Sequence, residues 1–523
     1  MDRKKDTMEL TILATSDIHG YLTADSYVDQ TEKTAYGYTR AVTVINEIRE
    51  NTAGEVLYIE NGDMLQGSPL ATYLQKFEET PHKIIETLNA IAPDASIVGN
   101  HEFNFGVDYL DQAIAAAEYP FLCANILRDG QPAFGQPYLI KQYGDIRVGV
   151  LGVTTQYVPN WEKPEIVEGF EFGSALAAVQ KYVPILKDDE QCDAIIVAYH
   201  GGYERSLTTN EPTERLTGEN EGSAILNAGL PIDALITGHQ HRKEAVVVNG
   251  IPTVQTGTRG ESIGKIVLDI QKNAENNVKS YELIDTTVVE EDLDTKAMLD
   301  ELIGSVQKWL DQPVGNSDGQ LLLGETFKAQ KETHPYINLL NKIQMEAMGT
   351  DISAIAIFNN EVQGFNKTIT MRDIINNYPF ANTLANVKLT GKELKDILEH
   401  NSNYFALDEA GELIVNPSYL YPKKELFNYD MFTGIDYTMD ISKPVGERIV
   451  SLSKDGQDIM NSDEYFIVTV NNYRAIGGGN FPHYESDKVL ENDPREVQDI
   501  LINYIVEEAK LTSDSSVNYR VKI

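Results

Sequence analysis

The stretch GNHEFNFG, residues 99–106, is the part of the chain around which the rest is organised. The apolar pair Ile97-Val98 precedes this stretch, so a strand is expected to end just before Gly99. The amide oxygen of Asn100 is a hard ligand that suits a divalent cation. The neighbouring His101 would point elsewhere, so one turn could present a metal ligand beside a general acid. Taken alone, so short a motif is equally compatible with an ordinary polar loop.

Four other stretches share this arrangement of a short apolar run followed by polar residues. They are TSDIHG (15–20), ENGD (60–63), YHGG (199–202) and TGHQH (237–241). Segments with a helical apolar period separate them, at 38–50, 81–91, 107–117 and 174–186. Alternation of strands and helices predicts βαβ units and a sheet covered on both faces. Because ligands gather beyond the carboxyl ends of such strands, the five stretches can converge on one site.

The five stretches supply a set of candidate metal ligands with oxygen and nitrogen donors. The set is Asp17, His19, Asp63, Asn100, His200, His239 and His241. Carboxylate, amide and imidazole without a thiolate favour Mn²⁺, Zn²⁺ or Fe over a structural cysteine-type zinc site. So many ligands suit two ions roughly 3.5–4 Å apart that share a carboxylate, and Asp63 is the natural bridge.

Each of these residues, considered singly, has an ordinary structural explanation. An aspartate at a strand end is usually a turn former or a helix cap, and a lone histidine is more often a satisfied polar residue than a ligand. However, five of the chain's 9 histidines lie in these stretches, namely His19, His101, His200, His239 and His241. Their accumulation beside two aspartates and an asparagine argues for one shared site.

Length and charge narrow the class of protein. The chain has 523 residues, and a single core rarely grows beyond roughly 250–300 residues, so at least two domains are expected. It carries 43 basic and 80 acidic residues, a net charge of -37. This balance argues against a nucleic-acid polymer or an anionic membrane surface as partner. It leaves room for a small phosphorylated ligand, because a local metal site can outweigh the global field.

The cysteines and the N-terminus bear on the cellular compartment. Cys123 and Cys192 lie in apolar, strand-like surroundings and are predicted to be buried free thiols rather than a disulfide. The apolar run at residues 10–14 is too short for the core of a signal peptide. No run approaches the ~18 apolar residues of a membrane span. We therefore expect a cytoplasmic protein, the alternative being a secreted or cell-surface protein whose leader has been removed. The sequence leaves the oligomeric state open.

The second half of the chain has a different character. Residues 246–285 resemble further strands, and residues 290–311 form an acidic segment with a helical period. We predict that residues 289–318 form a linker helix between a domain at 1–288 and a second α/β domain at 319–523. Within the latter, TGKE at residues 390–393 has the pattern of a capping box that opens a helix.

The ordered series DIHG, NGD, GNHE, YHGG and GHQH resembles the calcineurin-like two-metal phosphoesterases. The second half resembles the C-terminal domain of 5'-nucleotidases. Together they are similar to the superfamily of 5'-nucleotidases and 2',3'-cyclic-nucleotide 2'-phosphodiesterases/3'-nucleotidases over nearly the whole chain. The resemblance implies an αββα metallophosphoesterase sandwich with a dinuclear metal site, followed by an α/β domain that binds the nucleotide substrate.

The resemblance also implies a role for each motif residue. One ion would be held by Asp17, His19, Asp63 and His241, and the other by Asp63, Asn100, His200 and His239. His101 would act on the leaving oxygen or stabilise the pentacovalent phosphorus. The chemistry agrees, because two cations neutralise phosphate oxygens and lower the pKa of a bound water towards about 7, which gives a metal-bound hydroxide. A histidine with an unperturbed pKa near about 6.5 suits proton donation.

Three further features of the resemblance bear on the substrate. The 5'-nucleotidase branch commonly has aspartate where this chain has Asn104, whose amide can orient His101 but adds no charge. Phe380 and Tyr473 match the aromatic residues expected to stack on the base, with Asn382 as a polar contact; without the resemblance they would be ordinary core residues. Stacking tolerates any base. The three glycines at 477–479 favour a loop whose backbone approaches a ligand.

These observations predict a metal-dependent hydrolase of 2',3'-cyclic nucleotides and 3'-nucleotides. The alternative within the same class is a 5'-nucleotidase or a UDP-sugar hydrolase. An alternative from another class is a nucleotide-binding protein that has lost catalysis.

Overall fold

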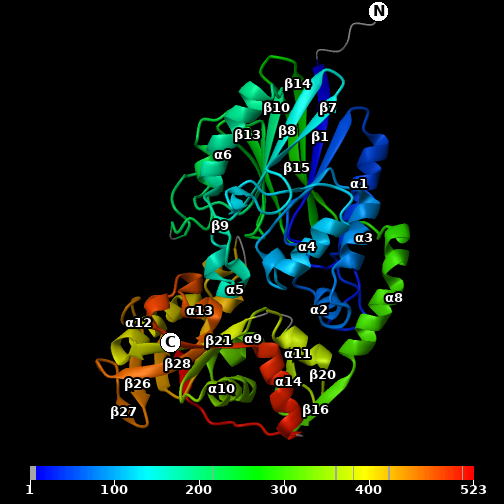
Figure 1. Cartoon of the computed structure of the whole chain (residues 1–523). Helices are drawn as coiled ribbons and strands as arrows, with labels where there is room; N and C mark the ends of the chain where they lie inside the picture. The colour runs from blue at the N-terminus through cyan, green and yellow to red at the C-terminus, as the bar shows by residue number, and fades with distance from the viewer. Residues whose placement is uncertain (1–6, 215, 360–361, 381, 422–423, 509) are drawn as a thin grey trace, which may run out of the picture. The chain divides into compact units, whose positions relative to one another are not determined.

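A computed structural model describes residues 7–523 apart from 215, 360–361, 381, 422–423 and 509. The chain divides into two compact units, the first ending at Val306 and the second running from Gln307 to Ile523. The division falls within helix α8 (Leu293–Leu310), which lies inside the segment predicted as a linker. Figure 1 shows the order of the elements along the chain.

The first unit contains two six-stranded sheets (Figure 1). One has the order β15-β14-β1-β2-β3-β4, with bounds Asn277–Asp285, Ser262–Gln271, Thr7–Thr15, Glu55–Glu60, Ala95–Ile97 and Phe121–Leu122. The other has the order β12-β13-β11-β10-β8-β7, with bounds Lys243–Val248, Ile251–Thr256, Ala234–Thr237, Ala194–His200, Ile146–Thr154 and Tyr138–Tyr143. β1, β2 and β3 run parallel, as do β8, β10, β11 and β13. The antiparallel strands lie toward the edges of the sheets.

The core of this unit lies between the two sheets. Alternate residues of each strand point inward, so that Leu10 and Ile12 of β1 share one cluster with Val148 of β8 and Ile196 of β10. The intervening residues of β8 and β10 pack against helix α6 (Ala175–Pro184) on the outer face of their sheet.

Helices cover the outer face of the other sheet as well. The Tyr38 hydroxyl at the start of α1 (Tyr38–Asn51) lies 2.7 Å from the hydroxyl of Tyr58 on β2. α3 (His82–Ile91) and α4 (Val107–Ala116) also form where the apolar period predicted helices. In Figure 1, α6 lies on the opposite side of the strands from α1 and α3. The αββα sandwich implied by the resemblance is therefore confirmed. The prediction of one sheet covered on both faces, drawn from alternation alone, is wrong.

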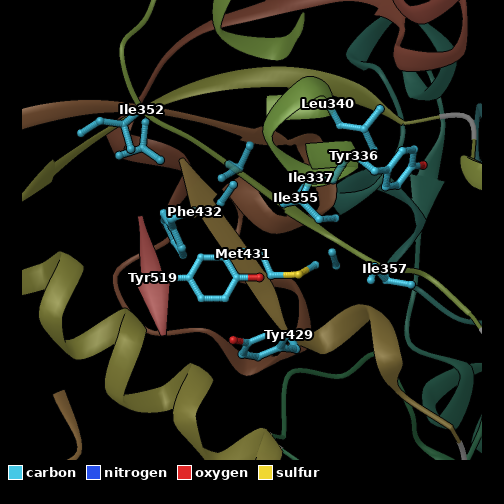
Figure 2. Packing of buried hydrophobic residues seen from close by; sticks show 14 of the residues in the cluster. Tyr336, Ile337, Leu340, Ile352, Ile355, Ile357, Tyr429, Met431, Phe432 and Tyr519 are labelled. Atoms are coloured by element: carbon cyan, nitrogen blue, oxygen red, sulfur yellow. The ribbon is translucent and has the colours of Figure 1, made fainter. Parts of the chain in front are cut away.

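The second unit is built on a five-stranded sheet of order β24-β18-β28-β21-β29. The bounds of its strands are Asp430–Thr433, Ser353–Ala356, Tyr465–Asn471, Thr383–Thr390 and Val489–Glu496. Helices α10 (Pro335–Met348), α11 (Met371–Asn377), α12 (Gly391–Asn401) and α14 (Val497–Glu508) accompany this sheet. Figure 2 shows Tyr336 and Leu340 of α10 packing in one core with Ile355 of β18 and Met431 of β24.

Smaller sheets complete the second unit. Strands β20 (Thr368–Thr370), β16 (Pro313–Ser317) and β30 (Lys510–Leu511) form one, and β27 (Gln457–Asp458), β26 (Ile449–Lys454), β25 (Asp436–Asp440) and β31 (Tyr519–Lys522) form another. The predicted capping box is confirmed: the Thr390 side chain accepts a hydrogen bond from the N–H of Glu393, whose carboxylate accepts one from the N–H of Thr390. It opens α12.

Cys123 and Cys192 are both free and buried, as predicted. Among the described residues, no helix is both long enough and apolar enough to cross a membrane.

Candidate metal centre

All seven predicted ligands lie at or just beyond the carboxyl ends of parallel strands in the first unit. Asp17 and His19 follow β1, Asp63 follows β2, Asn100 follows β3, His200 is the last residue of β10, and His239 and His241 follow β11. The two sheets therefore contribute to one place from the same edge. In five of these residues, Asp17, His19, Asp63, His239 and His241, the backbone is left-handed, with φ between 54° and 68°. Such strain in non-glycine residues is typical of functional sites.

The first group of ligands consists of Asp17, His19 and His241. The Nε2 atoms of His19 and His241 lie 3.0 Å apart. His241 Nε2 lies 3.4 Å from Asp17 Oδ1, and His19 Nε2 lies 4.0 Å from the same oxygen. Asp63 completes the group, because its Oδ2 lies 3.9 Å from His19 Nε2. These atoms surround a common point, as ligands of one ion do.

The second group consists of Asp63, Asn100, His200 and His239. His200 Nε2 lies 3.1 Å from Asp63 Oδ2 and 3.1 Å from Asn100 Oδ1. His239 Nδ1 lies 2.8 Å from the same Asn100 oxygen. The two groups thus share Asp63, in the arrangement that a bridging carboxylate between two ions requires.

The electrostatics of the centre fit divalent cations. Asp17 and Asp63 are fully buried, and within the described part of the chain their ion-pair partners are histidines. The buried Oδ2 of Asp63 receives no well-formed hydrogen bond from a described residue, although two imidazole Nε2 atoms face it. Buried carboxylates need compensating charge, and metal ions placed among these oxygens and nitrogens would supply it.

The protonation of the histidines is consistent with this fit. Burial lowers the pKa of His19 to about 3, so its imidazole is neutral and can offer a lone pair. Burial would raise the pKa of Asp17, but the hydrogen bond and charge of His241 hold it below its ordinary value. Burial opposes the charged form of His200 too, yet the carboxylate of Asp63 raises the His200 pKa to about 10. A cation bound beside Asp63 therefore competes with this proton.

Hydrogen bonds behind the ligands fix how their rings face. His19 Nδ1 lies 2.8 Å from the carbonyl oxygen of Gln66, and His200 Nδ1 lies 2.6 Å from that of Asn61. Donation to these carbonyls directs each Nε2 into the centre, where His19 offers a lone pair and His200 offers one once a cation displaces its proton. His239 is reversed: its Nδ1 faces the centre, and its Nε2 lies 3.0 Å from a carboxylate oxygen of Glu219. Glu219 carries no motif signal in the sequence.

Removing the Glu219 carboxylate should weaken metal binding without removing a ligand. We expect Glu219→Ala to lower the affinity for Mn²⁺ by about 10–100-fold, because outer partners of ligating histidines have effects of that size. Titration of the metal-stripped protein by calorimetry measures it. The matched control is Glu211→Ala, which removes an exposed carboxylate from the same segment and should leave the affinity unchanged. Equal affinities for the two variants would contradict the role of Glu219.

Glu102, inside the opening motif, is a second residue that sequence reasoning missed. Its carboxylate accepts hydrogen bonds from the backbone N–H groups of Asp63 at 2.8 Å, Met64 at 2.7 Å and Gly99 at 2.6 Å. It therefore ties the turn that carries Asp63 to the turn that carries Asn100. An acidic residue within a polar turn was the available signal, but it does not say which backbone the carboxylate will bind.

The two predicted catalytic residues lie together beside the ligands. The N–H of His101 donates to Asp63 Oδ1 at 2.8 Å, and His101 Nδ1 lies 2.6 Å from Asn104 Oδ1. Asn104 Nδ2 in turn donates to Glu162 Oε1. Burial raises the pKa of the Glu162 carboxyl to about 7, against the opposing effects of His101 and of the hydrogen bond from Asn104. Sequence reasoning did not identify Glu162.

The predicted base-binding residues lie in the second unit. Phe380 is 38% exposed, and its ring meets Phe358 edge-on at 5.2 Å between centroids. Tyr473 is half-buried in the short helix α13 (Asn472–Ala475), 6.4 Å from the ring of Phe427.

The loops that carry these residues are connected. The N–H of Thr383 donates to the side chain of Asn472 at 3.2 Å. The residue before Thr383, half-buried Asn382, accepts a hydrogen bond at its backbone carbonyl oxygen from the N–H of Val497 at 2.9 Å. The structure therefore brings the segments that follow α11 and β28 together within the second unit.

Two of the glycines at 477–479 pack closely against neighbouring side chains. A Cβ at Gly478 would come within 2.5 Å of the Tyr473 ring, and one at Gly479 within 2.1 Å of the Asn428 side chain. The guanidinium of Arg474, paired with buried Asp430 at 2.7 Å, lies beside the same loop. Close internal packing therefore accounts for glycine at 478 and 479, while the approach of this loop to a ligand stays a prediction.

The αββα sandwich and the ligands at its strand ends define a metallophosphoesterase. Residues 10–243 match the family model of calcineurin-like phosphoesterases, and residues 313–486 match that of the C-terminal domain of 5'-nucleotidases. Members of the former family use divalent metals.

Proteins similar to this one match it over nearly its whole length. A Staphylococcus aureus structure solved as a candidate 5'-nucleotidase in complex with alpha-ketoglutarate is 33% identical, with a TM-score of 0.89, over 98% of this chain and 100% of that one. The Haemophilus influenzae 2',3'-cyclic-nucleotide 2'-phosphodiesterase/3'-nucleotidase is 28% identical over 99% of this chain and 87% of its own length. The Bacillus subtilis trifunctional nucleotide phosphoesterase protein YfkN is 27% identical over 98% of this chain, which spans 39% of that protein. The chain belongs to the 5'-nucleotidase family of metallophosphoesterases and is a hydrolase, as its homologues named phosphodiesterase and nucleotidase are.

Proposed function

We propose that this chain hydrolyses nucleotide phosphoesters, with 2',3'-cyclic nucleotides and 3'-nucleotides as its preferred substrates. The observation that carries the proposal is that Asp63 Oδ2 faces both His19 and His200, with the His101 backbone donating to the other oxygen of the same carboxylate. That arrangement suits a phosphoryl centre, whose oxygens need charge neutralisation on one side and a proton donor for the leaving group on another.

Two divalent ions, chosen among Mn²⁺, Zn²⁺ and Fe, would be held in this centre. Asp17, His19, Asp63 and His241 would hold one, and Asp63, Asn100, His200 and His239 the other. When bound, such ions neutralise phosphate oxygens and make a water molecule acidic enough to act as nucleophile near neutral pH.

His101 would donate the proton that the leaving oxygen needs. The water oxygen forms a bond to phosphorus while the P–O bond to the ribose oxygen breaks. His101 Nε2 gives its proton to the departing oxygen, and the second proton of the water restores His101 while the first stays on the phosphate. Asn104 Oδ1, 2.6 Å from Nδ1, holds the ring in place during this transfer.

Two observations favour 2',3'-cyclic nucleotides and 3'-nucleotides as substrates. An amide at Asn104 supplies orientation without a negative charge beside His101, as in the cyclic-phosphodiesterase branch that the sequence resembles. The Haemophilus influenzae relative carries the name of that activity. The second candidate is 5'-nucleotide hydrolysis, which is favoured by the Staphylococcus aureus structure at 33% identity.

A substrate panel separates these candidates. Turnover of 2',3'-cyclic AMP, 3'-AMP and 5'-AMP is measured on the protein loaded with Mn²⁺. We expect the first two to be hydrolysed faster than the third. Dominant hydrolysis of 5'-AMP would overturn the proposed specificity. Nucleotide binding without turnover, even of the activated diester bis-p-nitrophenyl phosphate, would instead support a nucleotide-binding protein that has lost catalysis.

We further propose that Phe380 and Tyr473 stack on the base and that Asn382 makes a polar contact with the nucleotide. Because stacking contributes about 1–3 kcal/mol per base, Tyr473→Ala should raise KM for 2',3'-cyclic AMP by about tenfold. Hydrolysis of bis-p-nitrophenyl phosphate, which has no base, serves as the internal comparison and should change far less. The matched control is Tyr465→Ala, which removes a 61% exposed ring from β28. An unchanged KM in the Tyr473 variant would exclude this stacking role.

A cytoplasmic location stays a prediction from the sequence.

A further inference from the structure

The amide of Asn104 lies between the imidazole of His101, which faces its oxygen, and the carboxylate of Glu162, which faces its nitrogen. One end, Oδ1, lies 2.6 Å from His101 Nδ1, and the other, Nδ2, donates to Glu162 Oε1. A side-chain amide has two orientations that exchange its oxygen and nitrogen, and its hydrogen-bond partners decide between them. Above its raised pKa of about 7, the Glu162 carboxylate accepts hydrogen bonds and does not donate, so it selects the orientation in which the amide nitrogen faces it.

This choice sets the proton on His101. An amide oxygen only accepts hydrogen bonds, so the ring nitrogen facing it must carry a hydrogen. Neutral His101 then has its lone pair at Nε2, the atom that takes up and delivers the catalytic proton. If the amide were reversed, its N–H would face Nδ1, which would favour the other neutral form, with hydrogen on Nε2.

The segment that carries Glu162 is held in place independently of Asn104. It follows the 3-10 turn Val158–Asn160, and the N–H of Glu162 donates to the carbonyl of Val158 at 3.1 Å. The adjacent Trp161 ring lies 5.3 Å from the ring of His239. Glu162 is half-buried and 58 positions away from Asn104 in the sequence. Its carboxylate is therefore presented to the amide by the fold rather than by local sequence.

We propose that Glu162 is a positioning residue for proton transfer: acting through Asn104, it fixes the amide so that His101 keeps its hydrogen on Nδ1. The proposal rests on the proposed function and deepens it by naming the group that orients the proton donor. Within the described part of the chain, Glu162 forms hydrogen bonds with Asn104 and Val158 and with none of the predicted ligands.

The first test removes the carboxylate or only its charge. Glu162→Ala should lower kcat for 2',3'-cyclic AMP by about tenfold with little change in KM, since a positioned acid contributes about 10²–10⁴-fold and part of that depends on orientation. Glu162→Gln keeps a side chain of the same size, but its amide can donate as well as accept and no longer dictates the orientation of Asn104, so part of kcat should be lost. The loss should be much smaller with bis-p-nitrophenyl phosphate, because p-nitrophenolate departs without a proton. Glu165→Ala, an exposed carboxylate three positions away, is the matched control.

A second test reverses the hydrogen bond between positions 104 and 162. Asn104→Asp alone would set two carboxylates against each other and should lower kcat. Adding Glu162→Gln supplies an amide donor to the new carboxylate, which can again accept from His101 Nδ1, and should recover most of the loss. If Glu162 had a merely structural role, the double variant would lose kcat by the combined factors of the two single variants.

A spectroscopic measurement is independent of turnover. In ¹⁵N-histidine-labelled protein, the ¹⁵N shifts of His101 should report the Nδ1–H form in the wild type and a mixture of forms in Glu162→Ala. Unchanged shifts, equal losses on both esters, or an Asn104→Asp variant that Glu162→Gln fails to rescue would each overturn the proposal. Failure of the wild type to hydrolyse nucleotides would refute the proposed function alone, and the ¹⁵N shifts would still decide the role of Glu162.

Discussion

Asp63→Asn should abolish both metal retention and catalysis. Asp63 belongs to both ligand groups, with Oδ2 at 3.1 Å from His200 Nε2 and 3.9 Å from His19 Nε2. Without the Asp63 carboxylate, the two ions would have no bridging ligand. We expect kcat for nucleotide esters to fall by at least about 10³-fold, about 4 kcal/mol of transition-state stabilisation. Metal analysis of the purified variant, together with its turnover, measures both effects.

Asparagine is the right replacement because it tolerates the left-handed backbone, with φ at 59°. The variant should therefore fold, although its metal-free form should unfold at a lower temperature than the metal-free wild type, because the ion pair between Asp63 and His200 is lost. Asp111→Ala, exposed on α4, is the control and should keep both metal and activity. A variant at Asp63 that retained two ions and full turnover would refute the bridging role.

His101→Ala should separate proton donation from metal binding. We expect kcat for 2',3'-cyclic AMP to fall by about 10²–10⁴-fold, the range for a positioned general acid. The metal content should stay the same, because the contact of His101 with Asp63 comes from its backbone N–H, which alanine keeps. With bis-p-nitrophenyl phosphate the loss should be far smaller.

His82→Ala provides the control for His101, because His82 is exposed at the start of α3. It should behave as the wild type on both esters. If His101→Ala kept full activity on nucleotides, its assignment as proton donor would be wrong. If it lost metal along with activity, the residue would have to be regarded as part of the ligand set.

The sequence was sufficient to bring the predicted ligands together because they obey a local rule. Each lies where an apolar strand gives way to polar residues, and parallel strands end at one edge of a sheet. The same periodicity could not say that the strands form two sheets. It identifies elements and their buried faces, whereas the partners of each strand depend on contacts distant in sequence. The resemblance to a known family, rather than the periodicity, predicted the sandwich.

The residues that orient the centre could not be found in this way. Glu219 reaches His239, and Glu162 reaches Asn104, across loops with no characteristic spacing, so the fold alone makes them neighbours. Glu102 lay within the motif, but its backbone partners on the β2 turn are visible only in three dimensions. The glycine loop shows a further limit, since a glycine run indicates a need for space without saying whether a ligand or the protein fills it.

The central claim, that nucleotide ester hydrolysis depends on two ions sharing Asp63, is tested most directly by one titration. Metal-stripped protein receives increasing Mn²⁺, and turnover of 2',3'-cyclic AMP is followed against the equivalents of metal bound. We predict no turnover in the stripped protein and a rise that reaches its plateau at two bound ions per chain. Full turnover in the presence of chelator, or a plateau at one ion, would contradict the account.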